Sequence, residues 1–540
     1  MAEERHESGV WDVLVVGSGF GGSVVACRAA QCGKRVLVLE RGKWYRPGEF
    51  PRTPLQMADN LWNPKSERYG LFQLWSFRWM DAVVASGVGG GSLIYANVAM
   101  RMPAEWFCQQ RDLWPLDYAE LDEHYRAAEK MLGVQQFPAH LDERVPKIGR
   151  FDDAACGAGL RVEPAPLAVS FSAPDRPLGD DIDDGGNVHG VRRRTCRLCG
   201  ECDLGCNEGA KNTLDLTYLS AATSPQLRVP ATVRDLSDVR RITPVERGER
   251  IEYEVGYFHH DPVTGDRTCR TERARKVVLA AGALGTTWLL LRNSCPENLD
   301  RLSDRLGSGF SGNGDALGFL DADDDRTVDS SKGPVITRIA HADGHLVEDG
   351  GHPLFAAWMA TALEPRVYWR AVRLVVAHVA KRLVGRPDTD VSDEVAEVLE
   401  AAEKARSTMP VLVMGMDTTS VGSMRLDRRR RLEMDWPQLD ARRYLRRVWR
   451  TVDRLARAGR WRLRRGPSDW LSRGITAHPL GGAPMGRTVE EGVVDPFGRV
   501  FGHPGLYVAD GSVVPGPIGA NPSLTIAALA ERFATKIVED

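Results

Sequence analysis

The sequence has 540 residues, more than one hydrophobic core usually supports, so it predicts two domains. Its formal net charge of −2 gives no electrostatic basis for a nucleic acid as the main partner. The first ten residues lack the pattern of an export signal and no apolar run is long enough to span a bilayer, so we expect a cytoplasmic protein.

The chain opens with apolar runs around a glycine-rich turn. Residues 12–16 form an apolar run rich in β-branched side chains, which is typical of a strand buried on both faces. A glycine-rich turn follows at 17–22, helix-forming residues occupy 23–30, and a second apolar run at 35–39 ends in Glu40. This order of strand, turn, helix, strand and acid predicts a unit that binds a dinucleotide.

Each residue of the turn has a physical role in such a site. Gly17 allows the tight turn, Gly19 lets the backbone approach a pyrophosphate, and Gly22 lets the helix pack closely on the strand. The pyrophosphate would lie at the positive end of the helix, where Glu40 can accept hydrogen bonds from ribose hydroxyls. A glycine turn without a ligand is the alternative.

Four of the ten cysteines are clustered, at Cys196, Cys199, Cys202 and Cys206. Their spacing is that of a bacterial ferredoxin segment, although Asn207 replaces the usual proline. In two-cluster ferredoxins the fourth cysteine serves the other cluster, and this chain has no second such segment. The alternatives are a three-iron or four-iron iron–sulfur cluster, a zinc site, or reduced thiols. A cluster would suit the transfer of single electrons to a protein or a quinone.

A second G-x-G-x-x-G occurs at Gly307, Gly309 and Gly312. It follows a polar stretch instead of a buried strand, so it lacks the context of a dinucleotide site. We therefore expect one such site, which argues against an enzyme that binds FAD and NAD(P)H separately.

Residues 366–386 mix basic and apolar side chains in the pattern of an amphipathic helix. Two interpretations stay open. The helix packs on its own domain, or it makes a peripheral contact with a membrane from which it admits a lipophilic substrate.

The C-terminal region indicates which dinucleotide binds. Residues 505–511 predict a short strand that ends in Asp510 and a glycine, and a helix N-terminus follows at Asn521 and Pro522. An enzyme that binds NAD has no obvious need for this acid and helix N-terminus. A flavin does, because the acid can bind ribityl hydroxyls and the helix end can stabilise charge on the reduced ring. The dinucleotide is therefore predicted to be FAD.

With these residues in place, the sequence resembles the glucose–methanol–choline (GMC) oxidoreductases, in particular the branch that contains cholesterol oxidases. The matching segments keep the family's order along the chain: 17–22, 87–92, 277–286, 311–315, 478–482 and Asn521-Pro522. The stretch from 321 to about 474 matches weakly, as expected of a variable substrate-binding region.

The resemblance implies an α/β fold with two domains that are discontinuous in sequence. A Rossmann-like FAD-binding domain with a parallel sheet is expected from residues 10–110, 190–320 and 470–540. An α+β substrate-binding domain is expected from residues 111–189 and 321–469.

The resemblance also implies a catalytic pair. Hydride transfer from an alcohol carbon requires loss of the hydroxyl proton, which a neutral histidine can accept near pH 7. His478 and Asn521 occupy the positions of the family's histidine/asparagine pair, so His478 is expected to be the base and Asn521 to hold the hydroxyl. His503 is a weaker alternative.

Further FAD contacts are implied in two regions of the chain. A loop expected to wrap the flavin includes Gly87, Gly90 and Ser92, and other contacts are expected at Ala281, Gly282, Asp510 and Pro522. Some relatives attach FAD through a histidine near this loop. None occurs between residues 82 and 102, so we expect noncovalent FAD.

The implied function is oxidation of the CH–OH group of a bulky hydrophobic alcohol, such as a sterol, by hydride transfer to flavin N5. The electron acceptor would be oxygen, a quinone or a redox protein. The alternatives are a redox-neutral lyase on the same scaffold and an iron–sulfur electron-transfer protein. Cholesterol oxidases also use a glutamate for double-bond isomerisation, for which Glu364 is only a loose candidate.

Overall fold

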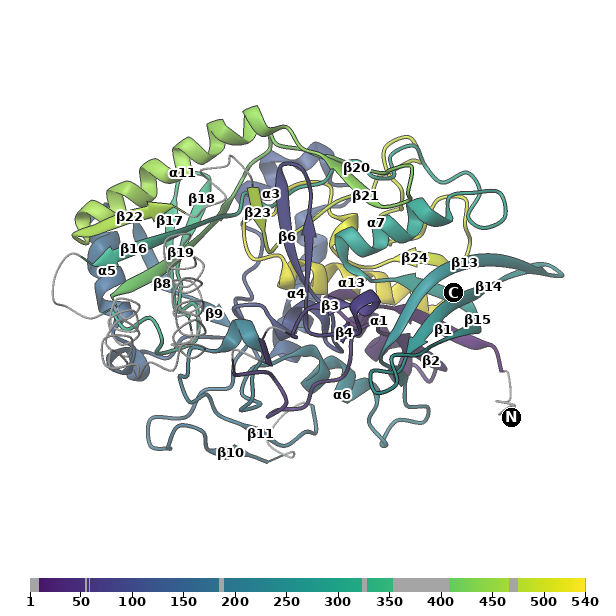
Figure 1. Cartoon of the computed structure of the whole chain (residues 1–540), viewed down its shortest axis with the longest axis horizontal. Coiled ribbons are helices and arrows are strands. Elements are labelled where there is room, and N and C mark those ends of the chain that lie inside the picture. The colour runs from purple at the N-terminus through teal and green to yellow at the C-terminus, as the bar shows by residue number, and fades with distance from the viewer. Residues whose placement is uncertain are drawn as a thin grey trace, which may run out of the picture.

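The computed structural model describes residues 9–53, 56–57, 59–183, 189–322, 328–352, 407–465 and 474–539. They form two large sheets that lie side by side, with helices packed on them (Figure 1). The helix predicted at 366–386 and the candidate Glu364 lie outside the described residues. None of the helices in the described ranges is long and apolar enough to cross a membrane.

The first sheet has a parallel centre built from β1 (Trp11–Val16), β2 (Val36–Leu39), β12 (Thr232–Arg234), β15 (Arg267–Leu279) and β24 (Leu506–Val508). β1 pairs in parallel with β2 and β15, while β12 joins β2 and β24 joins β15. The paired residues of β1 and β2 are buried, which explains their continuous apolar runs. The predicted α/β fold with a parallel sheet is confirmed.

The first half of β15 belongs to an antiparallel extension of the same sheet. It pairs with β14 (Arg250–His260), which pairs in turn with β13 (Ser237–Arg247). β15 therefore changes partner along its length, from β14 near its start to β1 and β24 near its end.

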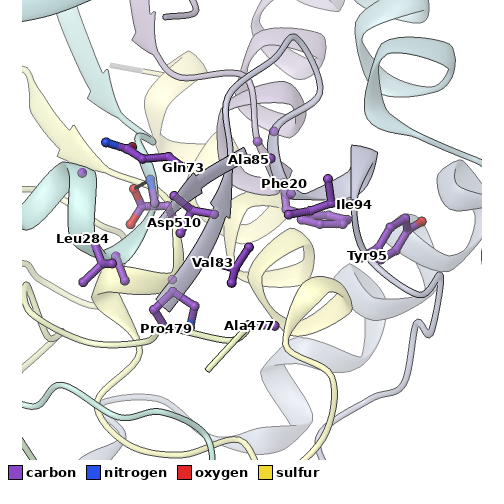
Figure 2. A pocket seen from close by; sticks show the side chains of 18 of the residues that line it. Phe20, Gln73, Val83, Ala85, Ile94, Tyr95, Leu284, Ala477, Pro479 and Asp510 are labelled. Atoms are coloured by element: carbon purple, nitrogen blue, oxygen red, sulfur yellow. Dashed lines mark hydrogen bonds between the residues drawn. The ribbon is translucent and has the colours of Figure 1, made fainter. Parts of the chain in front are cut away.

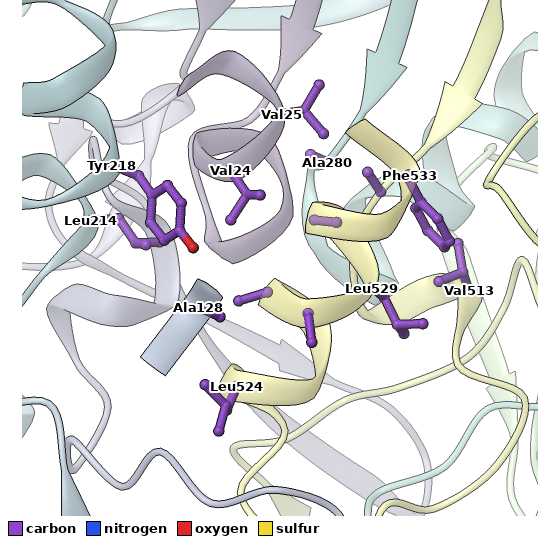
Figure 3. Close-up of a cluster of buried hydrophobic side chains, with 14 of the residues drawn as sticks. Val24, Val25, Ala128, Leu214, Tyr218, Ala280, Val513, Leu524, Leu529 and Phe533 are labelled. Carbon is purple, nitrogen blue, oxygen red and sulfur yellow. The ribbon is translucent and has the colours of Figure 1, made fainter. Parts of the chain in front are cut away.

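Five helices accompany the first sheet: α1 (Phe20–Gln31), α4 (Asp122–Leu132), α6 (Tyr218–Ala222), α7 (Gly282–Asn293) and α13 (Ser523–Glu539). α1 lies against α13 and α6, and α13 also contacts α4. Figure 3 shows Val24 of α1 between Tyr218 and the α13 side chains Leu524 and Leu529. These side chains are almost fully buried, and each such burial contributes about 1.5–3 kcal/mol.

The second sheet is antiparallel, with the order β22 (Trp461–Arg465), β16 (Ala316–Ala322), β19 (Thr408–Gly415), β18 (His345–Asp349), β17 (Arg338–Ala342) and β8 (Arg161–Pro164). Of the described helices, α5 (Lys147–Gly157) and α11 (Gln438–Ala458) cover it. α11 lies along one side of this sheet in Figure 1. It buries an apolar stripe that includes Val448, Val452 and Leu455 and turns its arginines outward, as the periodicity of an amphipathic helix requires.

A small third sheet joins the two halves of the molecule. β23 (Gly474–Thr476) pairs in parallel with β6 (Met80–Ala85), which forms a hairpin with β5 (Phe72–Ser76). The remaining described elements are short: β3 (Trp62–Asn63), β4 (Arg68–Tyr69), α3 (Ala104–Gln109), β7 (Gln135–Gln136), β9 (Pro166–Leu167), β10 (Asp181–Ile182), β11 (Arg193–Arg194), β20 (Ser423–Leu426) and β21 (Leu432–Asp435), with several single 3-10 turns between them.

Candidate active site

The glycine turn after β1 has the geometry predicted for it. Gly17 adopts a φ of +97°, in the left-handed region, and its N–H donates to Leu39 O at 2.8 Å. A Cβ on Gly22 would lie 2.1 Å from Gly17 O, so only glycine permits this close approach of α1. A Cβ on Gly19, in contrast, would meet nothing within 4 Å. Gly19 therefore borders open space at the start of α1, where no side chain caps the helix.

Glu40 lies under this turn and is buried. Its carboxyl accepts hydrogen bonds from the Ser18 N–H at 2.9 Å, the Ser18 hydroxyl at 2.7 Å and the Gly42 N–H at 2.9 Å. Burial raises the pKa of Glu40, and these hydrogen bonds oppose the rise. Glu40 therefore braces the turn, and it also lines the adjoining cavity. Its contact with a ribose stays a prediction.

The loop predicted to wrap the flavin, at 87–92, lies directly on the glycine turn. A Cβ on Gly90 would lie 2.6 Å from Gly19 Cα, and the Gly89 N–H donates to the Ser18 hydroxyl at 3.0 Å. The Ser92 hydroxyl donates to Gly89 O at 2.7 Å and accepts from the Leu214 N–H at 3.0 Å. The protein's own contacts therefore hold the loop against the turn.

A cavity of about 580 Å³ runs along these elements and into the second sheet. Figure 2 shows Phe20, Ile94 and Tyr95 in one part of it, with Leu284, Ala477 and Pro479 in another. Its lining includes most of the residues predicted to bind cofactor: Gly17, Gly19, Glu40, Gly90, Ala281, Gly282, Asp510, Asn521 and Pro522. An uncapped helix start, an open Gly19 and an elongated cavity fit a dinucleotide, so the residues present fit FAD.

Asp510 joins three elements at the middle of the cavity. One carboxyl oxygen accepts from the Gly282 N–H at 2.9 Å and the Thr286 hydroxyl at 2.5 Å. The other accepts from the N–H and the hydroxyl of Ser512, at 2.8 Å and 2.6 Å. Burial raises the pKa of Asp510 against these bonds. The acid thus links the end of β24 to the start of α7, and its contact with ribityl hydroxyls stays a prediction.

His478 and Asn521 both line the cavity, as the sequence predicted they would in a common site. His478 follows β23, and its Nδ1 lies 2.9 Å from Asp315 Oδ1. Asn521 precedes α13 and is buried, and its side-chain oxygen has no hydrogen-bond partner among the described residues. The main-chain N–H groups of Ile518 and Gly519, just before it, donate to the Asn313 side chain. The alternative base, His503, is not among the residues that line the cavity.

Glu348 was missed by the sequence reasoning. It lies in β18 with 0% exposure, and neither carboxyl oxygen accepts a well-formed hydrogen bond from the described residues. Burial raises its pKa to about 8, while the charge of His478 and the amide of Asn521 oppose the rise. The signal in the sequence was two adjacent acids, Glu348 and Asp349, in an otherwise apolar strand.

The structure gives no support to a metal site at the cysteine cluster. Across the described residues, which include all four cysteines, no three His, Cys, Asp or Glu side chains are arranged to hold a metal ion. The buried Lys211 links this loop to the segment after the 87–92 loop, because its Nζ donates to the carbonyl oxygens of Cys202, Leu93 and Tyr95. Burial raises the pKa of the Cys199 thiol to about 12 and that of Cys196 well above its usual value, so without a metal both thiols are protonated. An iron–sulfur or zinc site finds no support.

Fold and site together define an oxidoreductase that binds a dinucleotide, and comparison with known proteins agrees. Residues 12–307 and 418–530 match family models described as GMC oxidoreductase. The chain is 30% identical to cholesterol oxidase of Mycobacterium tuberculosis (strain ATCC 25618 / H37Rv) over 97% of this chain and 90% of that protein. It is 30% identical to cholesterol oxidase of Acinetobacter baumannii, over 98% and 94%, and 24% identical to a long-chain-alcohol oxidase of Arabidopsis thaliana, over 98% and 67%.

A solved structure agrees at the level of fold. The crystal structure of pyridoxine 4-oxidase from Mesorbium loti superposes with a TM-score of 0.60 at 20% identity, covering 97% of this chain and 99% of that one. The chain belongs to the GMC oxidoreductase family, and it is therefore an FAD-dependent enzyme that acts on alcohols.

Proposed function

We propose that this enzyme oxidises the hydroxyl of a bulky hydrophobic alcohol, such as a sterol, with noncovalent FAD. The observation that carries the proposal is His478 beside Asn521 in a cavity whose second-sheet wall is apolar. That wall includes Leu317 of β16 and Pro410 and Leu412 of β19, and the cavity is also lined by Val335 and Ile336 from the segment before β17. Such a wall favours a hydrophobic substrate over a sugar or an amino alcohol. Two cholesterol oxidases and a long-chain-alcohol oxidase among the relatives support the same substrate class.

FAD, when bound, supplies the hydride acceptor. We propose that the Gly17–Gly22 turn and the start of α1 hold its pyrophosphate and that Glu40 contacts the ribose. The 87–92 loop, Ala281, Gly282, Asp510 and the start of α13 would hold the flavin end. We also propose that the FAD-binding and substrate-binding domains divide along the segments predicted from the sequence.

The chain's own residues move the proton and orient the alcohol. Nε2 of His478 accepts the hydroxyl proton, which makes loss of hydride from the same carbon favourable. The Asn521 side chain, whose buried oxygen has no partner in the described part of the chain, holds the hydroxyl in place. The apolar wall excludes water from the reacting carbon.

Anaerobic spectroscopy tests the proposal. Purified enzyme is mixed with cholesterol, with long-chain alcohols and with short alcohols, and flavin absorbance is followed. We expect bleaching by the hydrophobic alcohols, and a loss of about 10²–10⁴ in its rate for His478→Gln. The exposed His140 gives the matched control, since its Nε2 bonds to Ser172 O and His140 is not among the residues that line the cavity. Turnover of an alcohol derivative without bleaching would indicate the redox-neutral lyase, and no bleaching by any alcohol contradicts the proposal.

The electron acceptor is tested in the same preparation. Reduced enzyme is exposed to air, to a soluble quinone, or to neither. Fast return of flavin absorbance in air supports oxygen as acceptor, as the relatives named oxidases suggest. Return only with quinone supports a dehydrogenase.

Glu348 favours a second activity, the shift of a double bond after oxidation. When an alcohol carries a double bond two carbons away, its oxidation gives a β,γ-unsaturated ketone. We propose that the Glu348 carboxylate removes a proton from the carbon between the carbonyl and the double bond and returns it to the far alkene carbon. A buried carboxyl beside both His478 and Asn521 is the observation that supports this role.

A further inference from the structure

The carboxyl group of Asp315 is the direct partner of the histidine at the site. Asp315 lies on the loop before β16, far along the chain from His478, and its side chain is 3% exposed. Its Oδ1 lies 2.9 Å from His478 Nδ1. Its Oδ2 accepts from the Thr476 hydroxyl at 2.9 Å and from the Ala477 N–H at 3.0 Å. Both oxygens are thus held by the segment that carries the histidine.

These contacts fix where the imidazole proton lies. A carboxylate can only accept, so Nδ1 of His478 must be the donor in its bond to Asp315. The neutral ring then has no proton on Nε2, which leaves that atom free to accept one. The main chain is also fixed, because the His478 N–H donates to the Thr476 hydroxyl at 2.9 Å while that hydroxyl donates to Asp315.

We propose that Asp315 is a positioning residue that holds His478 in the tautomer with Nε2 unprotonated and stabilises the imidazolium formed when it takes the alcohol's proton. This inference rests on the proposed role of His478 as base and deepens it. Asp315 itself touches neither the alcohol nor the reacting carbon, so it acts through the histidine.

The charges around the ring agree with this assignment. Burial alone would lower the pKa of His478, but the charge and hydrogen bond of Asp315, together with the charge of Glu348 in β18, raise it above its usual value. Asp349 lies next to Glu348, and the charges of Asp315 and Asp417 both act on the phenol of Tyr444. The pKa of Tyr444 is raised well above its usual range by burial, so this phenol stays neutral. Asp315 is therefore the one acid bonded directly to the ring among the described residues.

The test is ¹⁵N NMR of the flavin-loaded enzyme with ¹⁵N-labelled histidine rings, in which His478→Gln assigns the His478 signal. We expect the wild-type neutral ring to carry its proton on Nδ1. In Asp315→Asn the side-chain amide can still accept from Thr476 and Ala477 while its NH₂ faces Nδ1, which forces the ring proton to Nε2. A wild-type ring protonated on Nε2 overturns the inference, whether or not the variant folds.

The pH dependence gives a second readout that a structural role alone would not move. The base must be neutral, so the rate of flavin reduction falls as pH drops through the pKa of His478. Asp315→Asn removes a charge that raises this pKa, so the acid limb should move to lower pH, while the maximal rate falls about 10²-fold or more and KM changes little.

Asp417→Asn is the matched control, since Asp417 is also a buried acid and its carboxyl accepts from Thr419 instead of a histidine. It should leave the tautomer and the acid limb unchanged. An acid limb unmoved in Asp315→Asn overturns the inference. The two proposals can fail separately. If no alcohol reduces the flavin, the proposed function fails. The pairing of Asp315 with His478 still stands if the ring proton lies on Nδ1 in the wild type and on Nε2 in Asp315→Asn.

Discussion

Glu348 and Asp349 are neighbours in β18, yet their side chains lie in opposite environments because successive residues of a strand point to opposite faces. Asp349 pairs with the fully buried Lys147 at 3.1 Å and accepts from the Thr337 and Arg338 N–H groups. Lys147 also donates to the carbonyl oxygens of Asp349 and Gly350. The paired acid thus anchors the end of the strand, and Glu348 accepts no well-formed bond from the described residues although it lies near His478 and Asn521.

We predict that Glu348→Gln separates the two proposed activities. The amide mimics the protonated carboxyl, so alcohol oxidation should fall by less than about tenfold, whereas the double-bond shift, which needs a base, should fall about 10²–10⁴-fold. With a pKa of about 8, the wild-type carboxyl is mostly protonated at neutral pH, so the rate of the shift should rise with pH through that value. Absorbance distinguishes the ketone with the shifted double bond from the ketone without the shift, so it measures both activities. An unchanged shift in Glu348→Gln contradicts the role.

At the level of residues, the sequence led to His478 and Asn521 because each stands in a short segment with a local pattern. It did not lead to the roles of Asp315, Glu348 or Lys147. Asp315 lies in a matched segment, but its pairing with His478 spans 163 positions and leaves no local trace. Pairings of this kind depend on the tertiary fold and not on spacing along the chain.

α1 begins earlier than predicted, at Phe20 instead of residue 23. Two glycines therefore lie in its first turn, where each permits a close backbone contact. A Cβ on Gly21 would lie 1.5 Å from Ala509 O, and one on Gly22 would lie 2.1 Å from Gly17 O. Helix propensity alone places such glycines outside a helix, and tertiary packing overrides it here.

Two alanine substitutions in this turn should have different effects. Gly19→Ala should leave the fold intact, because its Cβ meets nothing within 4 Å, but weaken FAD binding by about tenfold or more by blocking the approach of the pyrophosphate. Gly22→Ala should lower the free energy of unfolding by about 1–3 kcal/mol or more through the clash with Gly17 O.

Flavin titration and denaturant unfolding measure the two effects. The control is Gly149→Ala in α5, an exposed helical site with open space around the new Cβ, where a gain of about 0.5–1 kcal/mol is expected. Equal FAD affinity in Gly19→Ala and wild type would count against the predicted pyrophosphate site.

The structure of the cysteine loop does not follow from the spacing of its cysteines. The spacing of Cys196, Cys199, Cys202 and Cys206 is compatible with a cluster, but spacing does not set the direction of the side chains. The loop is held by the bond from Lys211 to Cys202 O and by main-chain hydrogen bonds that join Leu198 and Gly200 to Gly333. The same residues therefore form a packed connection between the two halves of the molecule.

For the whole molecule, the parallel sheet was predictable and the antiparallel sheet was not. The strands of the first sheet are apolar runs next to glycine turns, so each carries its own signal. The second sheet joins β8 to strands more than 170 residues later, across a region where the sequence matches the family weakly. Its pairing order is set by contacts that are remote in sequence, which pattern reasoning does not reach.

We predict that removal of FAD destabilises both sheets together, because the cavity is lined by residues of both. A ligand present at 100 times its Kd adds about 2.7 kcal/mol to the free energy of unfolding. The flavin-free enzyme should therefore melt at a lower temperature in a single transition, and added FAD should restore the original melting temperature. Thermal melts of the flavin-free and FAD-loaded enzyme measure the two melting temperatures. In Gly19→Ala, added FAD should raise the melting temperature only slightly. Identical melting with and without FAD would contradict it.

Segments near residue 510 pack on segments near residue 20 to complete the first sheet and the cavity. β24 pairs with β15, the N-terminus of α1 lies against Ala509 just after β24, and α13 covers α1. During biosynthesis the glycine turn emerges early, but the far end of the cavity, with Asp510 and Asn521, emerges last. Cofactor capture therefore waits until Asp510 and Asn521 have both been synthesised. A truncated translation product that stops before β24 would expose the edge of β15 and the face of α1, which marks it for chaperones and proteases before it can sequester flavin.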